Sequence, residues 1–93
     1  MATLTEQEIR QALDGLPGWT SGGGEIVKEY KFGDFVAAVA FVNRVADRAE
    51  AADHHPDLDI RYNRVRVGLS THSVGGITAK DTALAAEIDA VAG

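Results

Sequence analysis

The sequence predicts an α+β domain, a four-stranded antiparallel sheet with three helices packed on one face. Three observations predict this fold: three segments with helical apolar spacing, three segments with strand composition, and a glycine-rich turn beside which a fourth strand fits. With 93 residues the chain can build one hydrophobic core but not two. We therefore expect residues 1–93 to form a single domain.

The first predicted helix begins at a capping box, in which Thr5 is the N-cap residue and Glu8 is the third helical residue. It should end near Gly15, because glycine accepts the left-handed exit conformation and Pro17 cannot continue the helix. Residues 25–32 have the composition of a strand, and residues 19–21 are the expected place for its hairpin partner. The glycines between these two segments predict a turn.

Asp34 is the expected N-cap residue of a long central helix that ends before Pro56. The helical spacing of its apolar residues predicts the face that packs on the sheet. That face carries Phe35, Val39, Val42, Ala46 and Ala49.

Apolar and polar residues alternate along residues 57–62 and 65–70, which predicts two strands of a hairpin. A two-residue turn at Asn63-Arg64 would place Tyr62 opposite Val65 and would bring His55 opposite His72 at the open end of the hairpin. A second capping pattern, from Thr78 to Asp81, then opens a last amphipathic helix with Leu84, Ile88 and Val91.

Composition excludes several functional classes. A net charge of −5 opposes nucleic-acid binding, and the absence of cysteine rules out disulfides, thiolate metal sites and cysteine nucleophiles. The longest apolar stretch, residues 35–46, is too short to cross a bilayer, and residues 1–6 lack signal-peptide features. We therefore expect a cytoplasmic protein that binds neither nucleic acid nor a membrane.

His54, His55 and His72 are the three histidines of the chain, and the predicted hairpin brings them together from two segments. Imidazole gives and takes protons near neutral pH, so this cluster points to acid–base catalysis. Asp53, Glu50 and Asp57 lie close enough in sequence to orient one of the rings. One alternative stays open, in which His54 and His55 cap the last carbonyls of the central helix.

Other chemistry finds less support in the sequence. Neighbouring residues of an extended chain point to opposite sides, so His54 and His55 are poorly placed to bind one metal ion, and no metal is expected. A triad through Ser70 or Ser73 would lack the turn that usually exposes a nucleophilic serine. Asp81 is accounted for by its place in the capping pattern.

The motif Asp53-His54-His55-Pro56, followed by Tyr62-Asn63, Leu69-Ser70-Thr71-His72 and Asp81, resembles the pterin-4a-carbinolamine dehydratase family over nearly the whole chain. Leu58 departs from the aromatic residue that many members have at this position. The resemblance implies a lyase that removes water from 4a-hydroxytetrahydrobiopterin and needs no cofactor. It implies catalysis by His54, His55 and His72, with His54 and His72 exchanging protons and His55 holding the ring. The implied substrate-binding residues are Asp53, His54, His55, Pro56, Ser70, Thr71, His72 and Ser73.

The resemblance also implies partners. The product, quinonoid dihydropterin, would be recycled for an aromatic amino-acid hydroxylase, and the chain would assemble as a homodimer or homotetramer. Exposed sheet edges independently favour such association, because another copy can pair with them. The alternative function is a dehydratase-like binding or assembly module that acts on a protein partner, although such relatives tend to lose the histidine motif that is present here.

Overall fold

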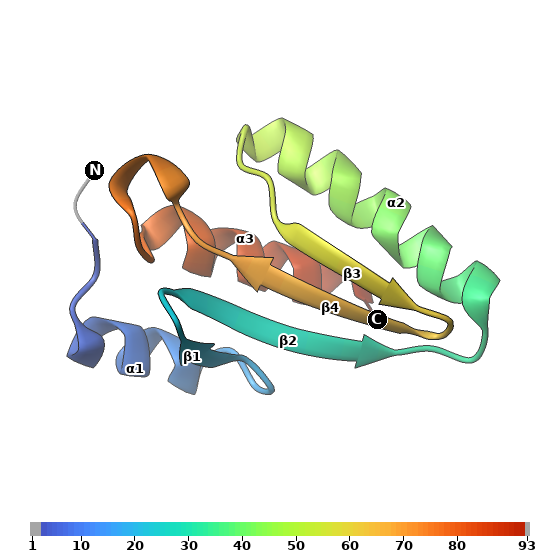
Figure 1. The fold of residues 1–93 in the computed structure, drawn as a ribbon, viewed down its shortest axis with the longest axis horizontal. Coiled ribbons are helices and arrows are strands. Elements are labelled where there is room, and N and C mark those ends of the chain that lie inside the picture. The colour runs from blue at the N-terminus through green and yellow to red at the C-terminus, as the bar shows by residue number, and fades with distance from the viewer. Residues whose placement is uncertain (1–2, 93) are drawn as a thin grey trace.

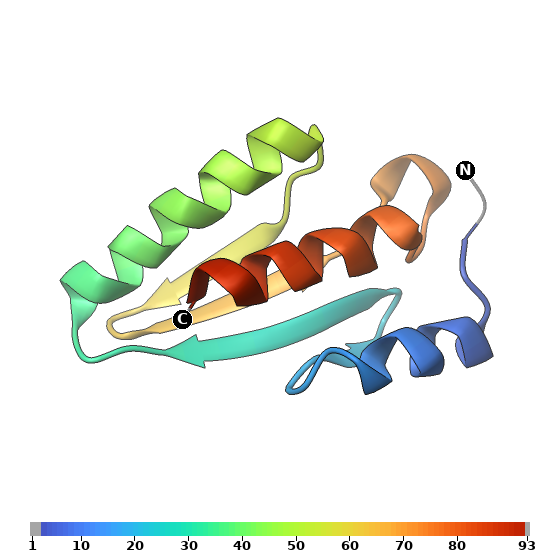
Figure 2. The ribbon, with the colours of Figure 1, turned by 180° about the vertical axis from the view of Figure 1, so that it is seen from behind.

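The computed structural model describes residues 3–92 and contains the predicted four-stranded antiparallel sheet and three helices. The strands lie in the order β1-β2-β4-β3. Figure 1 views the sheet from its uncovered side, called here the open face, and Figure 2 shows the helices on the other side. The elements are α1 (Glu6–Asp14), β1 (Thr20–Gly22), β2 (Glu25–Lys31), α2 (Phe35–Ala52), β3 (Asp57–Arg61), β4 (Arg64–Leu69), a 3₁₀ turn (His72–Val74) and α3 (Ala79–Ala92).

Local signals set most element ends as predicted, although Gly15, which ends α1, has φ of −94° and not the expected left-handed conformation. The Thr5 side chain accepts from the Glu8 backbone N–H and the Glu8 side chain from that of Thr5, which completes the capping box of α1. The Asp34 carboxylate caps α2 through the Ala37 N–H, at 2.8 Å. Gly23 and Gly24 have positive φ and form the turn between β1 and β2.

The core lies between the covered face of the sheet and helices α2 and α3. Tyr30 of β2 packs against Phe41 of α2 with ring centroids 4.7 Å apart, and Phe32 contacts the same ring at 4.9 Å. The fully buried large apolar side chains come from β2, β4, α2 and α3. They are Ile26, Val65, Val67, Leu69, Phe41, Val45, Leu84 and Ile88.

The face of α2 that packs on the sheet matches the predicted one only in part, because Ala49 is buried and Val42 packs against the core, but the largest contacts come from other residues. Ala38, Phe41 and Val45 are fully buried, whereas Phe35 is half exposed. The prediction failed for Phe35 because apolar residues occur on several sides of this helix, and spacing alone does not select one side. The aromatic contacts of Phe41 with the sheet select the observed face.

The register of the β3–β4 hairpin also differs from the predicted one. Arg61 pairs with Arg64, so the turn is at Tyr62-Asn63 and not at Asn63-Arg64. Asn63 is held in the turn by the end of β2, because its side-chain amide donates to the Phe32 carbonyl at 2.9 Å and its own carbonyl accepts from the Phe32 N–H at 2.8 Å. Apolar residues still share the covered face, with Leu58 opposite Val67.

A polar cluster fastens the last turns of α3 to the sheet. The Asp89 carboxylate accepts hydrogen bonds from Trp19 Nε1 at 3.2 Å, from Lys28 Nζ at 2.9 Å, and from the Tyr30 hydroxyl. Burial, and then the hydrogen bond and negative charge of Asp89, raise the pKa of Tyr30 far above its usual value. The Tyr30 hydroxyl therefore keeps its proton in the folded protein.

Candidate active site

The structure gathers the predicted site residues around one open cavity of about 260 Å³ at the end of the sheet where β4 leaves it. All the predicted residues except Pro56 line this cavity, and Lys80, which was not predicted, joins them. Leu58 is not among the lining residues. We call this space the histidine cavity; its lining residues are Asp53, His54, His55, Ser70, Thr71, His72, Ser73 and Lys80.

The end of α2 directs His54 and His55 away from the helix. Asp53 has a left-handed conformation, with φ of 49°, and its backbone N–H bonds the Ala49 and Glu50 carbonyls. The His54 backbone N–H also donates to the Ala49 carbonyl, at 3.1 Å. Backbone groups thus take up these terminal carbonyls, and both imidazole rings bond to carboxylates instead. The capping alternative for the two histidines is therefore wrong.

His54 is anchored on a buried carboxylate. Its Nε2 lies 2.5 Å from Oδ1 of Asp81, and the two side chains are 11% and 0% exposed. The other oxygen of Asp81 accepts from Thr71 Oγ1 at 2.9 Å and from the Thr78 backbone N–H at 2.8 Å. With three bonds on its two oxygens, Asp81 holds the His54 ring in one orientation.

The role predicted for Asp81 was therefore too narrow. The capping bond to Thr78 is present, but it occupies only one part of the carboxylate. Sequence spacing within the last helix revealed the cap, whereas the contact with His54 joins residues 27 positions apart. The signal available in the sequence was that this capping acid belongs to the same family motif as the three histidines.

His55 and His72 have different surroundings from His54. The exposed His55 ring is hydrogen-bonded through Nε2 to the Glu50 carboxylate, one of the acids near it in sequence. His72 is an exposed residue at the start of the 3₁₀ turn, and within residues 3–92 its ring has no hydrogen-bond partner. His72 is thus accessible to a ligand in the cavity.

The loop after β4 places His72 beside the other histidines. The Thr71 backbone N–H donates to the Gly76 carbonyl at 2.8 Å, and the chain between these residues turns back on itself. The predicted strand pairing of His55 with His72 is wrong, because β3 begins at Asp57 and β4 ends at Leu69. The loop, and not a strand pairing, brings the two residues to the same cavity.

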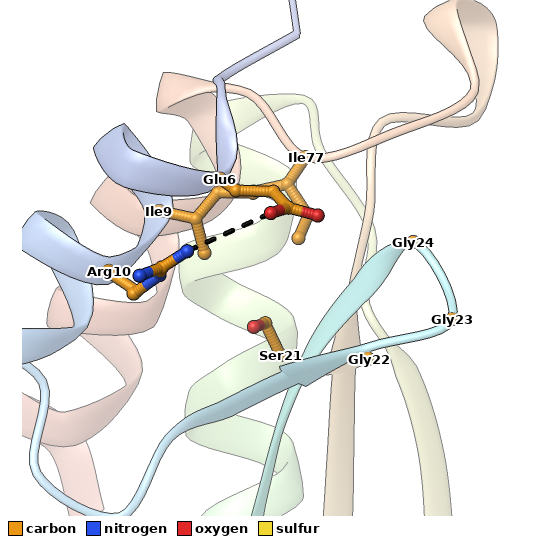
Figure 3. Close-up of a pocket in the computed structure, with 8 residues that line it drawn as sticks. All are labelled: Glu6, Ile9, Arg10, Ser21, Gly22, Gly23, Gly24 and Ile77. Carbon is orange, nitrogen blue, oxygen red and sulfur yellow. Dashed lines mark ion pairs between the residues drawn. The ribbon is translucent and has the colours of Figure 1, made fainter.

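A larger cavity, of about 380 Å³, lies between α1, the β1–β2 turn and Ile77 (Figure 3). Its two charged residues, Glu6 and Arg10, form an ion pair with each other at 3.8 Å on the exposed face of α1. It contains no histidine, and its one carboxylate is already paired with an arginine, so chemistry rather than size selects the histidine cavity. Across residues 3–92, no group of three or more metal-binding side chains is arranged to hold an ion, and no helix is long and apolar enough to cross a membrane.

The family model described as pterin 4 alpha carbinolamine dehydratase matches residues 2–91. The chain belongs to this family. A protein of Acidobacterium capsulatum, provisionally named pterin-4-alpha-carbinolamine dehydratase, is 55% identical over 98% of this chain and 99% of its own length. A protein of Chloroflexus aurantiacus with the same provisional name is 54% identical over the full length of both.

Solved structures support the same fold. The crystal structure of a transcriptional coactivator/pterin dehydratase from Brucella melitensis matches with a TM-score of 0.95 and 41% identity, over 99% of this chain and 100% of that one. A pterin dehydratase-like protein described as a RuBisCO assembly factor in the alpha-carboxysome matches with a TM-score of 0.68 and 24% identity, over 81% of this chain and 87% of that one. These comparisons confirm the family resemblance and the predicted fold class.

Proposed function

We propose that this protein is a 4a-hydroxytetrahydrobiopterin dehydratase, a lyase that works by histidine acid–base catalysis. The observation that carries the proposal is the histidine cavity, where an anchored imidazole, His54, and an unpartnered one, His72, line the same space. The family to which the chain belongs supports the substrate class.

The reaction requires two proton movements. The bond from C4a to the hydroxyl oxygen breaks, and that oxygen gains a proton and leaves as water. The proton on N5 is removed, and the electrons of the N5–H bond form the C4a=N5 double bond of quinonoid dihydropterin. One histidine gives the first proton and the other takes the second, and solvent restores both to their starting states.

The neighbouring groups fit this division of labour. The Asp81 carboxylate accepts a hydrogen bond from the protonated Nε2 of His54, so Nδ1 is the nitrogen of this ring that remains for the substrate. His55 is held by Glu50 and lines the same cavity, which suits positioning of the pterin ring. Backbone groups of Ser70, Thr71 and His72 are suited to bind the edge of that ring.

The test is the steady-state dehydration of synthetic carbinolamine. His54→Ala and His72→Ala should each lower kcat by about ten- to ten-thousand-fold, the range of acid–base catalysis or slightly below it. Lys31→Ala, at the exposed far end of β2, is the control and should leave kcat unchanged. An unaltered rate in His72→Ala would exclude a catalytic role for His72. The side chain makes no hydrogen bond within the part of the fold that the structure describes, so a change in stability could not offset a loss of rate.

A second candidate is a binding module for a protein partner. The Brucella melitensis protein is described as a transcriptional coactivator as well as a pterin dehydratase, and this favours a second role. The dehydration assay distinguishes the two functions, because a wild-type protein without dehydratase activity would leave only the binding role. In the enzymatic role, we propose that a cytoplasmic aromatic amino-acid hydroxylase uses the recycled pterin.

We also propose that the chain forms homodimers or homotetramers through the exposed edge strand β3. All five residues of β3 are exposed. Antiparallel pairing of two copies about Ile60 places Asp59 of each copy opposite the partner's Arg61, so the edge is complementary in charge to itself. Pairing of this kind gives a closed two-fold dimer.

Light scattering tests this pairing. Arg61→Glu should convert the assembly to smaller species, because four acidic side chains then meet across the edge. Adding Asp59→Arg to that variant restores opposite charges and should restore the mass. An assembly that ignores both changes, or a monomeric wild type at micromolar concentration, would contradict the proposal.

A further inference from the structure

A second cavity of about 320 Å³ adjoins the histidine cavity and shares Ser70 and His72 with it. It lies at the end of the sheet where the β1–β2 turn and the chain after β4 come together (Figure 1). Because His72 lines both spaces, a molecule that reaches this ring in one cavity can extend into the other. We call this space the acidic cavity; it is lined by Gly23, Gly24, Glu25, Asp57, Ser70, His72, Gly75 and Gly76.

Four of the lining residues are glycines, so no side chain enters the space from these positions. A Cβ atom added at Gly23, Gly24 or Gly75 would meet no atom within 4 Å. All three have positive φ, which explains why glycine occurs there. Their backbones thus form walls that leave room for a ligand.

The two carboxylates of the acidic cavity differ in what they already bind. Glu25 contacts Arg66 at 3.3 Å and lies directly over Gly68, so its side chain is held by the open face of the sheet. Asp57 neighbours Leu58, whose partner Val67 is buried on the covered face, so the Asp57 side chain belongs to the open face. Within residues 3–92 the Asp57 side chain has no hydrogen bond or ion pair. It is therefore an acceptor available to a ligand.

The chemistry of the proposed substrate places its substituent beside His72. In a tetrahydropterin, N5 is bonded both to C4a, which carries the departing hydroxyl, and to C6, which carries the substituent. A histidine that exchanges a proton at N5 or at the 4a-oxygen is therefore only a few bonds from that substituent. The acidic cavity begins at this histidine.

We propose that the acidic cavity binds a hydroxylated substituent on C6 of the substrate and that Asp57 selects for it by accepting a hydrogen bond from a hydroxyl group. A carboxylate only accepts, and hydroxyl groups supply the donors that it needs. This inference rests on the proposed dehydratase function and adds a determinant of substrate specificity to it. Apart from Ser70 and His72, which it shares with the histidine cavity, the acidic cavity contains no group that the proposed reaction uses.

The experiment compares two carbinolamines in the same assay, one with a dihydroxypropyl group on C6 and one with a methyl group. Asp57→Asn keeps an acceptor oxygen but loses the negative charge, so it should lower kcat/KM for the dihydroxypropyl substrate about three- to tenfold, the difference between a charge-assisted and a neutral hydrogen bond. The methyl substrate should be unaffected, because it has no hydroxyl group to donate. The change should appear in KM, with kcat retained.

Glu29→Gln is the matched control. It also replaces an acid by its amide on the open face, and Glu29 lines neither the histidine cavity nor the acidic cavity. Its ratio of kcat/KM values for the two substrates should equal that of the wild type. Thermal unfolding of both variants checks that each is folded.

The outcomes distinguish this inference from the function on which it rests. A wild-type protein that dehydrates neither substrate would overturn the dehydratase function itself. An active wild type in which Asp57→Asn affects both substrates equally would place this carboxylate at the pterin ring and overturn the specificity role. No effect on either substrate would show that the substituent lies elsewhere and would equally overturn it.

Discussion

Replacement of Asp81 by asparagine should separate the orientation of His54 from the stability of the fold. Oδ2 must remain an oxygen, because it accepts the Thr78 backbone N–H at 2.8 Å, so the new NH₂ group takes the place of Oδ1 and faces His54 Nε2. A donor then replaces an acceptor. To accept from this NH₂ group, His54 Nε2 must lose its hydrogen, and the ring then carries its hydrogen on Nδ1. The doubly protonated ring, which has a hydrogen on both nitrogens, is therefore disfavoured beside the amide.

The expected cost follows from the contacts. One charge-assisted hydrogen bond is lost in a buried site and partly replaced, which lowers the free energy of unfolding by about 1–2 kcal/mol. That is roughly 4–16 °C in Tm for a domain of this size, and less than a typical total stability of about 5–15 kcal/mol. The variant should therefore fold. Its kcat should fall about a hundredfold, near the lower end of an acid–base contribution.

Steady-state dehydration and thermal unfolding are measured on the same preparations. Thr78→Val is the control, because it removes the bonds of the Thr78 hydroxyl to Thr71 and to the Lys80 N–H and should cost a similar 1–2 kcal/mol, an estimate of about two hydrogen bonds. Thr78 does not line the histidine cavity, so kcat should stay close to that of the wild type. A folded Asp81→Asn protein with full activity, or an equal loss in Thr78→Val, would refute the reasoning.

Three further predictions concern pH, metals and the turn. The folded state holds the pKa of Tyr30 above its usual value of about 10, so the stability that Tyr30 contributes is complete below pH 10. Above pH 10 this contribution declines by up to about 1.4 kcal/mol per pH unit. Denaturant unfolding at pH 9–11 should show the decline in the wild type and not in Tyr30→Phe. Exhaustive chelation should leave dehydration unchanged, and a loss that zinc restores would contradict metal-independent catalysis. Tyr62→Gly should raise the free energy of unfolding by up to about 1 kcal/mol, because Tyr62 has φ of 52°, and a lower Tm would show that its exposed ring contributes more than the strain costs.

Local chemistry predicted the elements of this fold well. The hydrogen bonds of Thr5 and Asp34 to backbone N–H groups join residues three positions apart, and this spacing can be read from the sequence. The hairpin turn was misplaced by one residue, because the bonds that fix Asn63 come from Phe32, a residue next to another strand. The buried face of α2 was likewise decided by aromatic contacts across the core.

The candidate site shows the same division. Motif and hairpin together predicted that the three histidines would lie close together, although by a strand pairing of His55 with His72 that does not form. The contact of Asp81 with His54 and the bonds of Asp89 to Tyr30 were not predicted, since both join distant parts of the chain through side chains alone. Periodicity reports which side of an element is buried, and it carries no information about which polar groups meet there.

Two non-glycine residues have positive φ in the described part of the chain, residues 3–92, and these two, Asp53 and Tyr62, lie just outside the two ends of β3. An edge strand has a neighbour on one side only, so little in the sheet itself prevents it from sliding by a pair of residues. Here a slide would have to move both left-handed corners together, onto residues such as His55 or Arg64, where the same conformation would have to be rebuilt. The two corners therefore act as stops at either end of the strand. They keep His55 and the tip of the hairpin in fixed positions relative to β4, even when the outer edge of β3 has no partner.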